Sequence, residues 1–453
     1  MKSKFMKGLA VVLGLTMMMT TVGCGGSKSQ PATEVPAKEE AAPAKEGAEP
    51  AKGEAPASEE EVTLTFWHIW GAETDASYKP IQKVLADFAK DYPNIKIKVD
   101  TTENEAYKTK IKAAAAANEL PDLFSSWGGG FSKPFIEAGR VLPIDEYLED
   151  GTKDKLVGGA LSNVTYDGNV YGLTFGLSCG AFFMNEELFK QNNIKIPETY
   201  SELITAVKAF KEKGITPMAV SGKDIWTIAM YFDAMALKAA GNDAIINTVG
   251  AKQASFKDDP AFLDAAKKLA ELVELGAFPE GAAGLTKDES DIDFVLGKIP
   301  MLFNGSWTAG TVYREDSLIK DKIVVRGFPV FENGKGNKNQ FTGGAVDTIM
   351  INSDTKHKEA AVLFQKYFCE HMASEAYLAG AYLPAWKVDV DESNINPVTV
   401  QLAQLTSEAE GFTLWWDTLL EGNDTQVYLN SLQELFLKSI TPEEFVEKLE
   451  TTH

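Results

Sequence analysis

The sequence predicts an α/β fold that is divided between two lobes. The chain has 453 residues, of which 44% are hydrophobic, and this length exceeds what one hydrophobic core normally organises. From residue 62 onward, short β-branched and aromatic runs alternate with longer runs of helical spacing. A strand–helix–strand–helix–strand order implies a parallel sheet that is covered by helices.

Hydrophobic spacing assigns the first elements of this globular part. Residues 62–67 are β-branched and aromatic, and residues 95–99 alternate apolar and polar side chains, so both are expected to be strands. Residues 78–92 carry apolar side chains at helical spacing, residues 105–118 form an alanine-rich helix, and residues 121–124 form a short strand. The later expected elements are helices over 200–213, 260–275, 358–371 and 442–449, and strands over 323–325 and 348–351.

The first 23 residues have the features of an export signal. Three lysines within the first seven residues form a positive segment, and residues 8–19 are apolar, but they fall short of the about 20 residues of a membrane span. Residues 21–24 resemble the bacterial lipobox, with Thr21 where that motif usually has leucine. The resemblance implies a lipoprotein signal peptide over residues 1–23 and a lipidated Cys24. An ordinary cleaved signal peptide is the alternative.

Residues 24–61 are expected to form a disordered tether behind that cysteine. The segment is rich in Ala, Pro, Glu, Lys and Gly and has almost no large apolar side chains, so burial cannot offset the entropy of ordering it. A charged, proline-containing segment stays extended. Together, lipobox and tether favour anchoring on the outer face of a Gram-positive cell membrane, although a Gram-negative lipoprotein is the alternative.

Composition and motifs argue against several classes of function. The formal net charge of −21 repels phosphate backbones, so nucleic acid is not an expected partner. No histidine or cysteine spacing matches a metal site, and no cofactor is expected. Residues 176–180 match G-x-S-x-G, but a strand-like run follows where a nucleophile elbow needs a helix, so Ser178 is not expected to be catalytic. Cys179 and Cys369 are expected to be buried thiols, with a disulfide as the alternative.

Seven segments of the chain, taken in order, resemble the extracellular solute-binding proteins of ABC importers, in the sugar-binding class related to maltose-binding protein. Each segment is a weak signal alone, and their order carries the resemblance. Thr174 replaces the proline that usually follows the third segment. The segments are LTFWHIWG at 64–71, YKTKIKAAAAANELPDLF at 107–124, NVYGL at 169–173, FMNEELF at 183–189, PETYSEL at 197–203, GKIPMLFNGSW at 297–307 and HKEAA at 357–361.

The resemblance implies a two-lobed, periplasmic-binding-protein-like fold whose lobes are joined by three hinge crossings and close over a ligand. Glycines suit the crossings because hinge residues absorb backbone rotation. The crossings are expected near residues 174–180, 341–344 and 383–387. Lobe 1 is then expected to comprise residues 62–178 and 342–384, and lobe 2 residues 179–341 and 385–453.

The resemblance also implies a function without catalysis. The protein is expected to capture a mono- or oligosaccharide outside the cell and to deliver it, as a monomer, to the transmembrane subunits of an ABC transporter. Two alternatives remain open from the sequence. One is a binding protein for a non-sugar solute such as a polyamine or a peptide, and the other is an exported carbohydrate-active hydrolase.

Sugar sites need flat aromatic platforms for the C–H face of the ring and polar groups in plane for the hydroxyls. Trp70 and Trp127 follow predicted strands, and ligands of open α/β sheets collect at the carboxyl ends of strands. One residue of the pair Trp415–Trp416 is expected to reach the cleft, whereas Trp67 is expected to fill the core. The expected ligand-binding residues are Trp70, Glu73, Trp127, Trp226, Trp307, Asp347 and Trp416.

Overall fold

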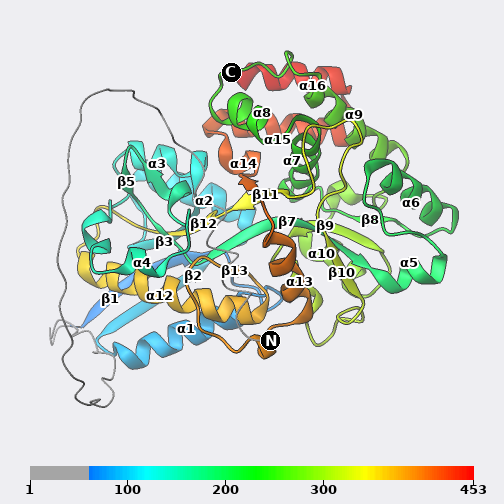
Figure 1. Ribbon diagram of the computed structural model, residues 1–453. Helices are drawn as coiled ribbons and strands as arrows, with labels where there is room; N and C mark the ends of the chain where they lie inside the picture. The colour runs from blue at the N-terminus through cyan, green and yellow to red at the C-terminus, as the bar shows by residue number, and fades with distance from the viewer. Residues whose placement is uncertain (1–60, 453) are drawn as a thin grey trace, which may run out of the picture.

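The computed structural model describes residues 61–452, so the expected signal segment, Cys24 and almost all of the tether lie outside them. Two β-sheets lie side by side, and each has helices packed against it (Figure 1). Lobe 1 contains the five-stranded sheet, and lobe 2 contains the larger sheet around the long strand β7.

The sheet of lobe 1 is mixed, with the strand order β2-β1-β3-β12-β6. Strand β1 pairs in parallel with β2 and β3, whereas β12 runs antiparallel to both β3 and β6. The sequence predicted a parallel sheet, and this is correct only for the first three strands. The other two strands, β6 and β12, lie next to segments that cross to lobe 2, and no helix connects either of them to the strand before it in the chain. The bounds are β1 (Val62–His68), β2 (Ile95–Thr101), β3 (Leu123–Trp127), β6 (Leu173–Thr174) and β12 (Asp347–Ile351).

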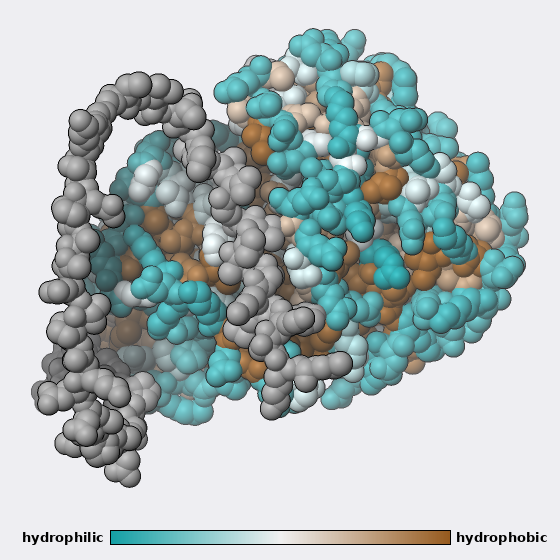
Figure 2. Space-filling model, viewed as in Figure 1, coloured by the Kyte–Doolittle hydropathy of each residue, from teal (hydrophilic) through white to brown (hydrophobic). Residues whose placement is uncertain are grey.

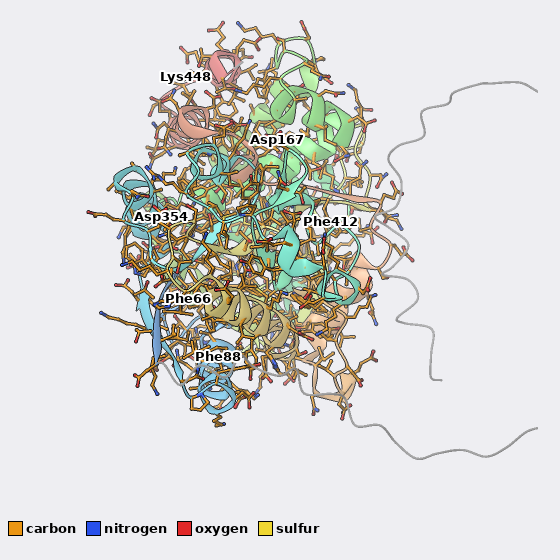
Figure 3. All side chains as sticks on the ribbon, turned by 90° about the vertical axis from the view of Figure 1, so that its left-hand side faces the viewer. Phe66, Phe88, Asp167, Asp354, Phe412 and Lys448 are labelled. Carbon is orange, nitrogen blue, oxygen red and sulfur yellow. The ribbon has the colours of Figure 1, made fainter. Side chains whose placement is uncertain are left out.

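Helices cover this sheet and bury an aromatic core. Phe364 packs edge-on against Phe88, with 4.9 Å between ring centroids, and against Phe66 of β1 at 5.5 Å. Figure 3 shows Phe66 and Phe88 near the long helix α12. The predicted helix over 358–371 extends to Ala379, where Gly380 adopts φ +74° and ends it. The helices are α1 (Tyr78–Asp91), α2 (Asn104–Ala117), α3 (Lys133–Glu137), α4 (Thr152–Lys155) and α12 (Lys358–Ala379), beside the hairpin of β4 (Thr165–Tyr166) and β5 (Asn169–Val170).

Strand β7 organises the sheet of lobe 2, whose order is β14-β11-β7-β9-β8. Its first residues pair with β13, its middle with β11, and its second half with β9 and β10. All of its residues except Leu177 are buried, in agreement with the strand-like run after the G-x-S-x-G segment. The bounds are β7 (Gly176–Asn185), β8 (Met218–Ala219), β9 (Met301–Gly305), β10 (Ile323–Arg326), β11 (Gln340–Gly344), β13 (Leu383–Pro384) and β14 (Gly411–Thr413).

Among the helices of lobe 2, α7 is buried on all sides. Every residue from Thr227 to Ala240 is buried, so α7 has no polar face, and its sequence lacks the amphipathic period by which a helix is recognised. The helices are α5 (Glu186–Asn192), α6 (Tyr200–Glu212), α7 (Trp226–Ala240), α8 (Asn242–Ile245), α9 (Pro260–Glu274), α10 (Lys287–Val295), α11 (Thr308–Val312), α13 (Pro397–Thr406), α14 (Trp416–Leu419), α15 (Gly422–Phe436) and α16 (Pro442–Leu449).

The chain passes between the lobes three times, as the resemblance implied. The first passage is at Phe175, between β6 and β7, and the second lies between β11 and β12. The third follows β13, which pairs with the start of β7 before the chain reaches α13. At the second passage, Gly343 has φ +131°, and a Cβ atom there would lie 2.1 Å from the carbonyl oxygen of Ser178. Only glycine permits this approach.

Hydrophilic residues cover most of the described surface on the face shown in Figure 2, and hydrophobic residues appear there in smaller areas. None of the helices within residues 61–452 combines the length and the apolar character that a membrane span requires.

Candidate functional site

A cavity of 660 Å³ lies between the two lobes. Lobe 1 contributes the loops after β1 and β2, the last residue of β3 and the start of α2, because the carboxyl ends of its parallel strands meet at this edge. Lobe 2 contributes the starts of α7 and α10, Trp307 and the segment 415–418. An enclosed cleft at a lobe interface is the usual place for a small-molecule site.

Five tryptophans line this cavity, and three of them form a row on the side of lobe 2. The ring centroids of Trp226 and Trp307 are 6.0 Å apart, and those of Trp307 and Trp415 are 5.8 Å apart. The indole N–H groups of Trp226 and Trp415 are buried and have no hydrogen-bond partner within residues 61–452. Buried donors normally have partners, and these two groups, which are shielded from solvent in this arrangement, are exceptions to that rule.

Trp70 faces the cavity from lobe 1 and is held by buried neighbours. Its ring stacks on His68, with 5.7 Å between centroids, and meets the edge of Phe175 at 5.4 Å. The backbone N–H of Trp70 donates to Nδ1 of His68 at 3.2 Å. Burial lowers the pKa of His68 to about 4, so the imidazole is neutral at physiological pH and can accept this bond.

Trp127 also lines the cavity from lobe 1, and it lies against Phe131 with 4.8 Å between ring centroids. Nζ of Lys108 lies 5.5 Å from the centre of the Trp127 ring. The same lysine forms ion pairs with Glu105 at 2.9 Å and with Asp417 of lobe 2 at 3.6 Å. Lys108 therefore connects an aromatic platform with polar groups of both lobes.

Carboxylates on the cavity wall already have hydrogen-bond partners. Asp347 is 8% exposed and accepts a hydrogen bond from the Tyr382 hydroxyl at 2.9 Å. Burial raises the pKa of Asp347 to about 6. Asp75 accepts a bond from the backbone N–H of Ser77 at 2.7 Å, and Asp224 accepts one from the backbone N–H of Lys287. These acceptors are fixed in place before a ligand arrives.

A second lysine offsets the negative charge of the wall. Nζ of Lys287 lies 2.7 Å from Asp291 and 3.7 Å from Asp288. Together with Lys108, it gives the cavity donors as well as acceptors. A neutral ligand rimmed with hydroxyls, which both donate and accept, matches this mixture.

The lobes are in contact at the mouth of the cavity. The Thr74 hydroxyl of lobe 1 donates to Asp288 of lobe 2 at 3.2 Å. The backbone N–H of Gly310, in α11 of lobe 2, donates to the carbonyl oxygen of Gly380 at 2.9 Å, at the end of α12. Two hydrogen bonds therefore join the lobes in the described arrangement, one of them at the wall of the cavity.

The structure brings five of the seven expected site residues to one cavity, namely Trp70, Trp127, Trp226, Trp307 and Asp347. Glu73 is exposed and does not line it, and Asp75, two residues further along the same loop, does. The expectation for Glu73 is corrected on this point, because the turn after β1 directs Asp75 rather than Glu73 towards the cavity.

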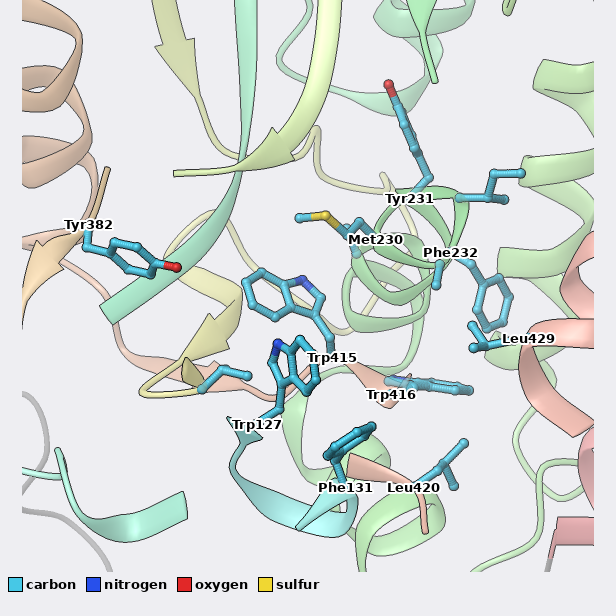
Figure 4. Close-up of a cluster of buried hydrophobic side chains, with 14 of the residues drawn as sticks. Trp127, Phe131, Met230, Tyr231, Phe232, Tyr382, Trp415, Trp416, Leu420 and Leu429 are labelled. Atoms are coloured by element: carbon cyan, nitrogen blue, oxygen red, sulfur yellow. The ribbon is translucent and has the colours of Figure 1, made fainter. Parts of the chain in front are cut away.

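The expectation for Trp416 is also corrected. Trp416 is 1% exposed and packs against Phe232 at 5.3 Å and Tyr428 at 5.4 Å, in the core of lobe 2. Figure 4 shows Trp416 on the side of Phe232, and Trp415 beside Trp127 and Met230. Trp415 lines the cavity in its place. Helix α14 begins at Trp416, so the two neighbouring side chains point in different directions.

Sequence reasoning missed several residues of the cavity wall. Asp75 and Asp224 stand close to expected tryptophans in the sequence, and that proximity was the available signal. Helical periodicity offers no such signal for Lys108, because it does not separate a cavity-facing position from a solvated one. The missed residues with polar or aromatic side chains are Asp75, Lys108, Asp224, Lys287, Tyr382 and Asp417.

Other residues singled out in the sequence lie away from the cavity. Ser178 is buried within β7, its hydroxyl has no hydrogen-bond partner within residues 61–452, and α5 begins only after Asn185. This geometry does not match a nucleophile elbow. Cys179 and Cys369 are separate buried thiols, as expected. Within residues 61–452, no group of three or more His, Cys, Asp or Glu side chains is placed to hold a metal ion.

Similar proteins of known structure share this architecture. A protein solved in a study of xylan utilization by the thermophilic bacterium Caldanaerobius polysaccharolyticus is 42% identical, with a TM-score of 0.84 over 86% of this chain and 99% of that one. A chitin oligosaccharide binding protein is 29% identical, with a TM-score of 0.80 over 86% and 98%. These matches confirm the two-lobed fold.

Sequence comparison leads to the same family. The multiple sugar-binding protein of Streptococcus mutans is 24% identical over 338 residues, which cover 71% of this chain and 74% of that protein. The maltotriose-binding protein of Pyrococcus abyssi is 25% identical over 345 residues, 75% of this chain and 71% of that protein. A family model described as bacterial extracellular solute-binding protein matches residues 71–372. This chain therefore belongs to the family of bacterial extracellular solute-binding proteins.

Proposed function

We propose that this protein captures a short oligosaccharide outside the cell and delivers it to an ABC importer. The observation that carries the proposal is the row formed by Trp226, Trp307 and Trp415, which lines a cavity of 660 Å³ together with Trp70 and Trp127. Flat indole rings match the C–H faces of sugar rings. Carboxylates and lysines at the same wall match the hydroxyls.

Xylan-derived oligosaccharides are the substrate class that we favour. The relative from the study of xylan utilization is 42% identical over nearly its whole length. A xylose unit lacks an exocyclic hydroxymethyl group, so both faces of its ring can lie flat between indole rings. The cavity of 660 Å³ falls within the about 300–1,000 Å³ of sites that enclose a small ligand, which suits a short oligosaccharide rather than a polymer.

The proposed mechanism is closure without chemistry. The two lobes close around the sugar by rotation at the three crossings, near residues 174–180, 341–344 and 383–387. The contact between Thr74 and Asp288 forms on closure. The transmembrane subunits of the importer then recognise the closed form. No group of the chain is proposed to act on the sugar covalently.

The proposal includes a location. Residues 1–23 would direct export and be removed, and lipid on Cys24 would anchor the protein to the outer face of a Gram-positive cell membrane as a monomer. The lipobox-like segment before Cys24 supports this part of the proposal. Metabolic labelling with a fatty acid tests it, because label must appear on the protein and be lost in Cys24→Ala.

Isothermal titration of the purified protein tests the substrate. Xylo-oligosaccharides are compared with chito-oligosaccharides, maltotriose, raffinose, spermidine and amino acids. We expect binding of xylo-oligosaccharides and a loss of at least about tenfold in affinity in Trp307→Ala, because truncating a central aromatic residue typically costs 2 kcal/mol or more.

Trp67→Ala is the matched control, since Trp67 lines neither this cavity nor its neighbour and contacts Lys110, with Nζ 4.0 Å from the ring centre. Binding of spermidine or amino acids in place of sugars would overturn the substrate class. Cleavage of a bound xylo-oligosaccharide would contradict the proposal that the protein binds sugar without catalysis.

A further inference from the structure

A second cavity of 820 Å³ adjoins the first between the lobes. Five residues line both cavities: Glu105, Lys108, Trp127, Asp417 and Thr418. The remaining wall comes from α2 and α3 of lobe 1 and from α15 of lobe 2. A ligand held in the first cavity can therefore extend into the second along the shared residues.

Aromatic surface continues from one cavity to the other. Trp127 lines both cavities, and Phe131, which lines only the second, lies 4.8 Å from it between ring centroids. Figure 4 shows Trp127 between Trp415 of the first cavity and Phe131. Phe135 and Pro134 enlarge this apolar wall. The second cavity thus offers a platform for the face of a further sugar ring.

Lys112 gives the second cavity a cation that has no acidic partner. It follows Lys108 by one turn of α2, lines only the second cavity, and its Nζ lies 4.8 Å from the centre of the Phe131 ring. Lys108 is paired with Glu105 and Asp417, whereas Lys112 forms no ion pair within residues 61–452. Burial, and next the charge of Lys108, lower the pKa of Lys112 and outweigh the opposite effect of Glu105 and Asp417.

We infer that the second cavity is a subsite for an acidic sugar unit, a uronate, carried by an oligosaccharide whose neutral units occupy the first cavity. The inference rests on the proposed function. The uronate ring would lie against Trp127 and Phe131, and its carboxylate would bind Lys112. Glu105 and Asp417 lie at the shared end, where Lys108 balances only one of their two negative charges. The remaining negative charge repels an incoming carboxylate and so favours its binding at the far end, beside Lys112.

Titration of the full chain at low salt tests this inference. The probes are a neutral xylo-oligosaccharide and the same oligosaccharide with one glucuronic acid unit. We expect the acidic sugar to bind about tenfold more tightly, since a hydrogen bond to a charged group contributes roughly this much. The advantage should shrink as salt is added, because ions screen the pair.

Lys112→Gln should remove the advantage of the acidic sugar and leave the neutral sugar unaffected, whereas Lys112→Arg should retain it. Lys110→Gln is the matched control, because Lys110 lies on the same helix but pairs with Asp100 and lines neither cavity. Equal affinity for both sugars, or an advantage that survives in Lys112→Gln, would overturn the inference while neutral binding upholds the proposed function. Failure of both sugars to bind would overturn the proposed function itself.

Discussion

Asp347 shows how one buried carboxyl group can serve binding at the expense of stability. It is 8% exposed, it lines the first cavity, and burial raises its pKa from 3.8 to about 6. Without ligand, the folded protein is therefore more stable when this carboxyl group is protonated. Its ionised form is the better acceptor for sugar hydroxyls, and it is fully populated only above pH 6.

The pH dependence of binding follows from this shift. As the pH falls from 8 through about 6, protonation of Asp347 removes charged acceptor capacity from the cavity wall, so sugar affinity should fall. Titrations between pH 5 and pH 8 measure this effect. His68 provides no competing change in that range, because its pKa is about 4. A flat affinity profile in the wild-type protein would contradict the prediction.

Asp347→Asn should have opposite effects on binding and on stability. The raised pKa favours the folded state only while the group is protonated, so this contribution is complete below pH 3.8 and is lost as the pH rises through about 6. At pH 7, removing the ionisable group should stabilise the unliganded protein, by up to on the order of 3 kcal/mol, and weaken sugar binding. Urea unfolding at pH 7 and pH 4 provides the comparison, and the gain should vanish at pH 4.

At the scale of elements, the buried carboxyl group of Asp233 joins three helices of lobe 2. It lies in α7, accepts a hydrogen bond from the Tyr428 hydroxyl of α15 at 2.6 Å, and accepts another from the backbone N–H of Trp416, where α14 begins, at 2.9 Å. Burial raises the pKa of Asp233 well above its ordinary value. This contact fixes the segment that presents Trp415 and Asp417 to the cavity.

Asp233→Ala should destabilise the protein and also weaken sugar binding. It leaves the Tyr428 hydroxyl and the Trp416 N–H buried without an acceptor, at a cost of about 2–5 kcal/mol. Because Asn keeps one carbonyl oxygen, Asp233→Asn should lose less stability. Urea unfolding and sugar titration of both variants check this, with Tyr428→Phe as the control that removes only one donor. Unchanged affinity in a destabilised Asp233→Ala protein would show that the network does not position Trp415.

For the whole molecule, function depends on how closely the lobes approach. Gly310 of α11 in lobe 2 faces Ala76 and Ala379 of lobe 1, and a Cβ atom at Gly310 would lie 2.5 Å from the Ala76 side chain and 2.7 Å from the Ala379 carbonyl oxygen. Nothing larger than hydrogen fits at this position when the lobes are closed.

Gly310→Val should hinder closure and leave each lobe folded. We expect sugar affinity to fall by at least about tenfold, because overpacking typically costs 1–3 kcal/mol, and we expect the melting temperature without sugar to change little. Small-angle scattering should show that sugar compacts the wild-type protein more than the variant. Gly284→Val is the control, since a Cβ atom at Gly284 meets no atom within 4 Å. Equal compaction of both variants would contradict this prediction.

Local patterns in the sequence determined much of lobe 1. The strands at Val62–His68 and Ile95–Thr101 and the helices α1 and α2 lie within a few residues of their predicted bounds, because their burial follows the periods of two and of 3.6 residues that spacing reveals. Helix α7 was not predicted, because tertiary packing buries it on every side and its sequence therefore shows no alternation of polar and apolar faces. The strand over 348–351 was predicted and is observed as β12, but its antiparallel direction was not predicted, because its partners in the sheet come from distant parts of the chain.

The sequence by itself determined the family and the two-lobed α/β class, and it predicted Trp70, Trp127, Trp226 and Trp307 as ligand-binding residues, all of which line the cavity. These follow from the order of motifs and from side chains whose flat apolar faces have few other uses in loops. Only the tertiary structure decided between Trp415 and Trp416, and between Glu73 and Asp75. Neighbouring residues have the same local sequence, and which of them faces a cavity depends on backbone directions that contacts between distant elements impose.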